Sequence, residues 1–272
     1  MGVILDDITT YSSSLTGGAF EALTVQSGQS LSLRWLGRDT QATLLDAWGS
    51  NSAHKCDFSI RSPLLHDNTR GIRFAHMFEP TLSVADGNPQ LYLPPYWTQP
   101  YEPTDTLIVE CNGTASDAVV FTQMIKYESP DVQGARLLTA GEVKSRRKNL
   151  VGIRVQPTAS GTAGVFGTAV AINTNDDRLK ANTDYALLGL TSDRPITTLE
   201  FYGPDTANFP IATPGHWNEA ITSGWFYEMA HRFNEPLIPV INSNNKGVTY
   251  VRIADCTASS APLVSLLFAE LS

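Results

Sequence analysis

The chain has 272 residues, of which 42% are hydrophobic and 17% are charged, so it can bury one large core or two ordinary cores of roughly 120 residues each. Its formal net charge of −8 and isoelectric point near 5.1 exclude the broad positive surface with which proteins usually bind nucleic acids. We therefore expect no sequence-specific nucleic-acid partner.

The N-terminal stretch MGVILDDITT shows neither an export signal nor a lipid anchor. It has no basic region before its short apolar run, and Asp6 stands where a myristoylation signal requires Ser or Thr. Cys56, Cys111 and Cys256 are odd in number and far apart, which argues against a disulfide framework and against a Cys-x-x-Cys zinc site. We predict that they are core thiols of a protein made in a reducing cytoplasm.

Short apolar or alternating segments, separated by Gly, Pro, Asn and Asp, run along the whole chain. Period-two segments of this length with turn residues between them indicate an all-β sandwich or barrel. The predicted strand-like segments are 23–36, 106–113, 118–128, 150–157, 168–177, 247–255 and 262–271.

One helix is predicted, over residues 214–233. Trp217, Ile221, Trp225 and Met229 recur every four residues, and Thr213 with Pro214 supplies a start signal. Gly224 lies inside the predicted helix and weakens it.

The phrase AHMFEP at 75–80 returns as AHRFNEP at 230–236, and three other blocks also recur in the same chain order. A duplicated domain repeats several phrases in order, whereas a duplicated ligand motif repeats only itself. We therefore predict an internal duplication. In it, Ala75, Phe78 and Pro80 occupy corners equivalent to those of Ala230, Phe233 and Pro236. The other three pairs are 16–25 with 162–171, 33–49 with 187–203, and 114–128 with 257–271.

The duplication predicts two domains joined by a polar linker. Each copy is large enough for about eight strands, which is the size of a jelly roll. The predicted fold is all-β, with two tandem jelly-roll barrels and short helices in loops. The barrels span 1–130 and 150–272, and the linker spans 131–149.

The repeated phrase also raises the possibility of metal sites, because it places His76 near Glu79 and His231 near Glu235. Cupins are metal-binding jelly rolls that can also occur as tandem copies, but their pattern requires a second His that each copy here lacks. A histidine hydrogen-bonded within the fold is the favoured interpretation. We predict no catalytic residue, no metal and no cofactor.

Two surface segments are predicted to make contacts. The loop 91–105 concentrates prolines and aromatic residues, which suits an interface as well as a stacking platform. The segment 144–148 is the one basic run, and it is either a contact for an anionic surface or a charged linker. The candidate residues are Pro94, Pro95, Tyr96, Trp97 and Tyr101 in the loop, and Lys144, Arg146, Arg147 and Lys148 in the basic run.

With its length, its repeated blocks and no coherent catalytic set, the chain resembles the double jelly-roll major capsid proteins of tailless icosahedral viruses and phages, many of which contain a membrane. The resemblance implies a non-enzymatic virion protein that forms homotrimers, whose six barrels make a pseudo-hexagonal capsomer. It also implies neighbouring capsomers, minor capsid proteins or an internal membrane as further partners.

Two alternatives remain open. One is a tandem-barrel metal enzyme of the bicupin type or a sugar-binding module, and the other is a trimeric phage spike protein. Retained metal distinguishes the first from a capsid subunit, and formation of a lattice distinguishes the second.

Overall fold

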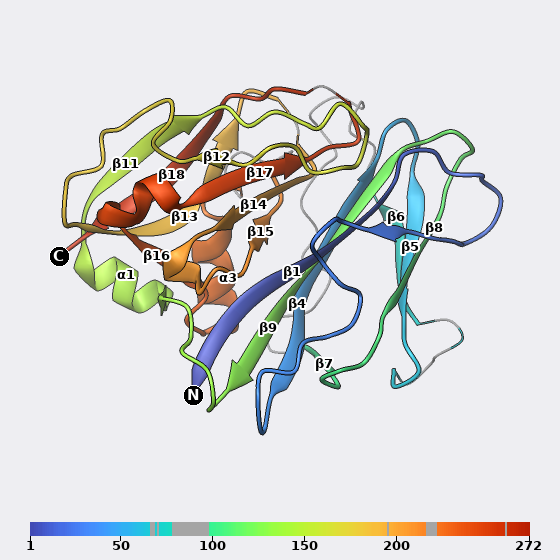
Figure 1. Ribbon diagram of the computed structural model, residues 1–272, viewed down its shortest axis with the longest axis horizontal. Coiled ribbons are helices and arrows are strands. Elements are labelled where there is room, and N and C mark those ends of the chain that lie inside the picture. The colour runs from blue at the N-terminus through green and yellow to red at the C-terminus, as the bar shows by residue number, and fades with distance from the viewer. Residues whose placement is uncertain (66–68, 70, 78–97, 195, 216–221, 259) are drawn as a thin grey trace.

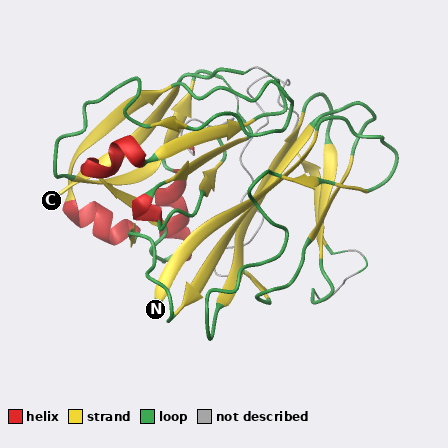
Figure 2. Cartoon of the chain, viewed as in Figure 1, coloured by secondary structure: helices red, strands yellow, loops and turns green. Residues whose placement is uncertain are grey.

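The computed structural model describes residues 1–65, 69, 71–77, 98–194, 196–215, 222–258 and 260–272. The chain is predominantly β, as predicted, and its strands form four antiparallel sheets, none of which closes on itself within the described residues (Figures 1 and 2). We refer to β1–β9 as the first half and to β10–β18 as the second half.

The first half contains a five-stranded and a four-stranded sheet. Their strand orders are β3-β1-β9-β4-β7 and β2-β8-β5-β6. The strands are β1 (Gly2–Ser12), β2 (Glu21–Ala22), β3 (Thr24–Val25), β4 (Gln41–Asn51), β5 (Cys56–Arg61), β6 (Ile72–Met77), β7 (Gln99–Tyr101), β8 (Ile108–Asn112) and β9 (Val119–Ser129).

The second half repeats this division, with strand orders β10-β16-β13-β18-β11 and β12-β17-β14-β15. Its strands are β10 (Leu137–Leu138), β11 (Arg147–Val155), β12 (Val170–Ala171), β13 (Asp184–Ser192), β14 (Thr198–Tyr202), β15 (Ile211–Thr213), β16 (Ile238–Asn242), β17 (Tyr250–Ala254) and β18 (Val264–Leu271). Its helices are α1 (Ala140–Arg146) and α3 (Trp225–Phe233), with 3₁₀ turns η1 (Pro204–Thr206) and η2 (Ser243–Val248).

Eight strands of each half share one strand order, and only the fifth strand of the larger sheet differs, because β3 lies next to β1 whereas β10 lies next to β16. The run β1-β9-β4-β7 corresponds to β11-β18-β13-β16, and β2-β8-β5-β6 corresponds to β12-β17-β14-β15. An irregularity also recurs: β4 shifts register between Leu44 and Asp46, and β13 shifts between Leu187 and Gly189. The partners of these residues, in β9 and β18, lie at matching positions of the repeated blocks 114–128 and 257–271.

Two of the repeated blocks do not follow this strand correspondence. Block 33–49 contains most of β4. The residues of 187–203 that align with this part of β4 contain β14, whereas the strand that corresponds to β4 in the sheets is β13. The residues of AHMFEP that the structure describes lie in β6, but AHR of the second phrase lies in α3. The prediction that Ala75 and Ala230 occupy equivalent corners is therefore wrong. Phe78 and Pro80 lie outside the described residues.

The four sheets stand side by side in the order β2-β8-β5-β6, β3-β1-β9-β4-β7, β12-β17-β14-β15 and β10-β16-β13-β18-β11 (Figure 1). The sheet of β9 is therefore covered on both faces, and nearly every residue of β9 is buried. Phe121 stacks on Phe58 of the first half, with ring centroids 4.6 Å apart. The adjacent Thr122 instead hydrogen-bonds Thr198 of the second half. Alternate side chains thus build two different interfaces.

The predicted helix over 214–233 is confirmed only for its second part. Helix α3 begins at Trp225, with Gly224 as its N-cap, and ends at Phe233 before Asn234, whose φ of 55° is left-handed. Thr222 is also helical, and Ser223 and Gly224 form a turn between it and α3, so the predicted helix is broken at Gly224. Residues 216–221 lie outside the described residues. No helix in the described ranges is long and apolar enough to cross a membrane.

The predicted linker, 131–149, contains regular structure. Strand β10 pairs with β16, and Thr139 is the N-cap of α1. Its hydroxyl accepts from the Glu142 backbone N–H, while the Glu142 carboxylate accepts from the Thr139 backbone N–H. This reciprocal capping explains why so short a helix is stable in an otherwise β fold.

Candidate functional site: the seam between the two halves

The seam is the contact between sheet β3-β1-β9-β4-β7 of the first half and sheet β12-β17-β14-β15 of the second half. The first-half side chains that point into it are mostly polar and nevertheless buried. They include Asp7, Thr9, Asp46, Trp48, Ser50, Thr122 and Lys126. Since buried polar groups are stable only when they are hydrogen-bonded, the geometry of these contacts holds the halves in register.

A line of hydrogen bonds crosses the seam from Trp48 to Asp7. The Trp48 indole donates to the Thr198 hydroxyl at 3.2 Å, Thr198 and Thr122 are 2.7 Å apart, and Thr122 and Thr9 are 2.9 Å apart. The Thr9 hydroxyl donates to Asp7 Oδ2 at 2.7 Å. An indole N–H can only donate and each hydroxyl has one proton, so every donor in the line points toward Asp7.

Asp7 and Glu200 approach each other across the seam from β1 and β14. They are 2% and 0% exposed. The Gln29 amide donates to both, at 2.9 Å to Asp7 Oδ2 and 2.8 Å to Glu200 Oε1, and Arg252 donates to Glu200 Oε2. Asp7 Oδ1 is buried without a hydrogen-bond partner among the described side chains and backbone. One amide therefore ties together two carboxyl groups from different halves.

Burial shifts the pKa values of this cluster upward. It raises the pKa of Glu200 to about 7, although Arg252 opposes the shift. The pKa of Asp7 rises well above its usual range through burial and then through the negative charges of Glu200 and Asp6. Burial also raises the pKa of Asp6 to about 6, against the lowering effect of Arg34. A desolvated carboxylate is costly, and a second carboxylate nearby adds to the cost.

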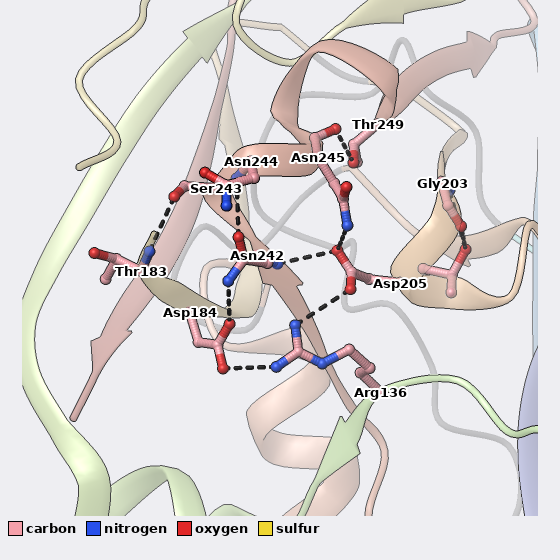
Figure 3. Close-up of polar contacts among 11 residues, drawn as sticks. Arg136, Thr183, Asp184, Gly203, Asp205, Asn242, Ser243, Asn244, Asn245 and Thr249 are labelled. Atoms are coloured by element: carbon pink, nitrogen blue, oxygen red, sulfur yellow. Dashed lines mark hydrogen bonds and ion pairs between the residues drawn. The ribbon is translucent and has the colours of Figure 1, made fainter. Parts of the chain in front are cut away.

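Arg136 fastens the linker to the second half (Figure 3). Its guanidinium donates to Asp184 at 2.6 Å and to Asp205 at 3.2 Å. Asn242 donates its amide to Asp184 at 2.9 Å and its backbone N–H to Asp205 at 3.0 Å, and Asn245 donates to Asp205 at 2.7 Å (Figure 3). Burial alone would raise the pKa of Asp184, but the bonds from Arg136 and Asn242 outweigh it and lower that pKa. This network is a structural anchor with its charges already paired.

Two shallow pockets flank this anchor. The acidic side chains that line them are both paired, Asp184 with Arg136 and Glu270 with Lys180. One pocket has a volume of about 310 Å³ and is lined by Lys148, Asn182, Thr183, Asp184, Asn242, Glu270, Leu271 and Ser272. The other has a volume of about 270 Å³ and is lined by Ala135, Arg136, Leu137, Leu138, Arg146 and Val240.

The predicted basic run lies at the surface, at the end of α1 and the start of β11. Lys144, Arg147 and Lys148 are exposed, and Arg146 is half-buried. Strand β11 is an edge of its sheet, so these side chains border an outer margin of the molecule. The basic run is therefore accessible to a binding partner.

Of the predicted aromatic loop, Pro94, Pro95, Tyr96 and Trp97 lie outside the described residues. Tyr101 ends β7 and is buried, and its hydroxyl donates to Gln123 at 3.0 Å. The structure therefore places Tyr101 in the interior of the first half and not on an outer loop, because β7 pairs with β4 and turns the ring inward.

The histidines of the repeated phrase are not equivalent. His231 is exposed on α3 and stacks on Tyr227, whereas His76 belongs to β6. In the described part of the chain, no three His, Cys, Asp or Glu side chains converge as metal ligands would. Cys56, Cys111 and Cys256 are buried free thiols, which agrees with the prediction for them.

The sequence reasoning missed the seam carboxylates. The available signal was two adjacent acidic residues, Asp6 and Asp7, inside the strand-like start of the chain, where a half-exposed strand would place only one of them on its polar face. Glu200, between Leu199 and Phe201, carries no such signal, because this alternation also fits a strand with one exposed face.

Neither a protein-family profile nor a curated protein sequence matches the chain. A solved structure described as "Crystal structure of PBSX exported protein XepA" is similar in part. The comparison covers 99% of this chain and 86% of that chain, with 10% identity and a TM-score of 0.24. A similarity this low carries no functional argument.

Proposed function

We propose that the chain is a structural virion protein, a major capsid protein that consists of two tandem jelly rolls and assembles as trimers. The observation that carries this proposal is the pairing of strands within each half. A jelly roll is a long antiparallel hairpin of eight strands rolled up on itself, so its first strand pairs with its eighth, its second with its seventh, its third with its sixth and its fourth with its fifth.

Both halves have this pairing. In the first half β1 pairs with β9, β2 with β8, β4 with β7 and β5 with β6. In the second half β11 pairs with β18, β12 with β17, β13 with β16 and β14 with β15. The four strand pairs of one half correspond to the four of the other, and a register shift recurs at the same place in β4 and β13. These correspondences support an internal duplication more strongly than the repeated phrases do.

The arrangement of the halves suits a shell subunit. Hydrogen bonds and buried charges join them across the seam, so that one chain would present two similar but non-identical sandwiches in a set orientation. Six sandwiches in a closed trimer would need heterologous contacts, in which one half of each chain meets the other half of the next. Divergent copies allow the contacts within and between chains to differ.

The proposal is tested by the mass of the native protein in solution, measured by light scattering, with bound metal quantified on the same sample. We expect a metal-free trimer of about three times 29.6 kDa, or larger shell-like particles in electron micrographs. A monomer or dimer with about one metal ion per half would contradict the proposal and favour a bicupin. A trimer that never forms a lattice, alone or with other virion proteins, would favour a spike protein.

The basic run is a candidate contact surface in this assembly. The double variant Arg147→Glu, Lys148→Glu should weaken the assembly while leaving the melting temperature nearly unchanged, because both side chains are exposed. Lys55→Glu is the matched control, since Lys55 is an exposed lysine of the first half. Unchanged assembly of the double variant would remove the basic run from the interface.

A further inference from the structure

The cluster around Asp7 and Glu200 in the seam contains more buried negative than positive charge. Asp6, Asp7 and Glu200 are each at most 3% exposed, and the guanidinium groups that pair with them are those of Arg34 and Arg252. With all groups ionised, three negative charges face two positive ones. A buried net charge is costly enough that such a site normally binds a counterion or a proton.

The unpaired member of the cluster is Asp7. Asp6 pairs with Arg34 and Glu200 pairs with Arg252, whereas Asp7 receives only neutral donors, Thr9 and Gln29, both on Oδ2. Its Oδ1 has no partner in the described structure. A metal ion is a poor counterion here, because the two guanidinium groups occupy the carboxylates that would ligate it and no set of metal ligands converges in the described residues.

We propose that the seam is a proton-binding site, in which one proton shared by Asp7 and Glu200 joins the two halves and its release as the pH rises loosens their contact. A carboxyl group that carries this proton can donate to the other carboxylate, and the Gln29 amide nitrogen holds Asp7 Oδ2 and Glu200 Oε1 close together by donating to both. Two carboxylates cannot form that bond without a proton. The proton would therefore replace repulsion across the seam with a direct bond between β1 and β14.

The groups that face this proton come from every element packed around it. Asp6 and Asp7 belong to β1, Glu200 to β14 and Arg252 to β17, while Gln29 and Arg34 come from the connection between β3 and β4. Thr9 of β1 also donates to Asp7, and the line of donors behind it continues through β9, β14 and β4.

The sign of the pH dependence follows from the raised pKa values. Both carboxyl groups titrate near pH 4 when unfolded, and the pKa of Glu200 is about 7 in the folded chain. The folded chain thus binds more protons than the unfolded chain between those values, so this stabilisation of the seam is fully present below about pH 4 and is lost as the pH rises to and through about 7. One released proton changes the unfolding equilibrium constant by up to about tenfold per pH unit.

The test measures the unfolding equilibrium constant by urea denaturation between pH 5.5 and 8.5 for the full chain and for Asp7→Asn, which keeps the shape of a protonated carboxyl group. We expect the constant of the unmodified chain to rise about tenfold or more over this range beyond the change seen in Asp7→Asn. Glu102→Gln, in which an exposed carboxylate is removed, should follow the unmodified chain. Parallel curves for the unmodified chain and Asp7→Asn would overturn the proposal.

A second measurement covers the case in which Asp7→Asn does not fold. Infrared difference spectra of the unmodified chain between pH 6 and 8.5 should show loss of a protonated carboxyl C=O band, and Glu200→Gln should alter that band. Absence of any such band while the chain remains folded would overturn the proposal. The proton site does not depend on the virion function, since a chain that never assembles would still show this pH dependence.

Discussion

Trp48 offers a direct test of how the halves are held together. Its indole N–H donates across the seam to the Thr197 carbonyl at 3.1 Å and to the Thr198 hydroxyl at 3.2 Å, and its ring meets Trp225 edge-on with centroids 5.6 Å apart. Trp48→Phe keeps an aromatic ring in the site but removes the donor. The carbonyl and the hydroxyl then remain buried without it.

The expected loss can be worked from these contacts. A buried acceptor left without a hydrogen-bond donor lowers the free energy of unfolding by about 1–3 kcal/mol, and the poorer packing of the smaller ring lowers it by about 1 kcal/mol more. Trp48 is only 4% exposed, so water cannot replace the lost donor without opening the seam. We therefore expect Trp48→Phe to lower the free energy of unfolding by about 2–4 kcal/mol.

The assay is urea unfolding followed by far-ultraviolet circular dichroism, because tryptophan fluorescence would change with the substitution itself. Trp35→Phe is the matched control: Trp35 is 63% exposed, and its variant should stay within about 0.5 kcal/mol of the unmodified chain. A loss below about 0.5 kcal/mol for Trp48→Phe would refute the role assigned to this contact.

Two further substitutions test the packing and the charges of the second half. Gly189→Ala should lower the free energy of unfolding in urea by at least about 1–3 kcal/mol, because a Cβ atom there would lie 2.1 Å from the Thr222 carbonyl oxygen. Gly152→Ala is the control and should be tolerated, since its Cβ atom would approach nothing closer than 3.6 Å. Equal losses for the two variants would contradict the reasoning. Arg252→Met should lower the free energy of unfolding by about 3–5 kcal/mol, because it leaves Glu200 buried without its cation. The loss at pH 8 should exceed the loss at pH 5, where Glu200 is protonated. A loss that does not depend on pH would show that the lost packing, and not the charge, is responsible.

The fold class could be predicted because strand periodicity is a local property. The segments 118–128, 150–157, 247–255 and 262–271 contain or overlap β9, β11, β17 and β18, respectively. The repeated blocks 114–128 and 257–271 contain most of β9 and all of β18, which hold corresponding places in the strand orders of the two halves.

The repeated phrase that first indicated a duplication did so for the wrong reason. Ala75 lies in a strand and Ala230 in a helix, so two similar short sequences adopt different backbone conformations in different surroundings. Helix α3 packs against β13, β16 and α1, and this tertiary contact stabilises a helix that short sequence similarity cannot predict.

The sequence by itself determined that the chain forms β-strands with two unlike faces. Along β9, alternation separates Phe121 from Thr122 whatever the surroundings, because successive side chains point to opposite sides of a strand. Only the tertiary structure decided that the polar face meets a second sheet and not water. The contact between the two sheets places Asp7 and Glu200 together and raises their pKa values. The free energy of a carboxylate depends on the groups that replace its hydrating water. Here those groups come from strands nearly two hundred residues apart in the sequence.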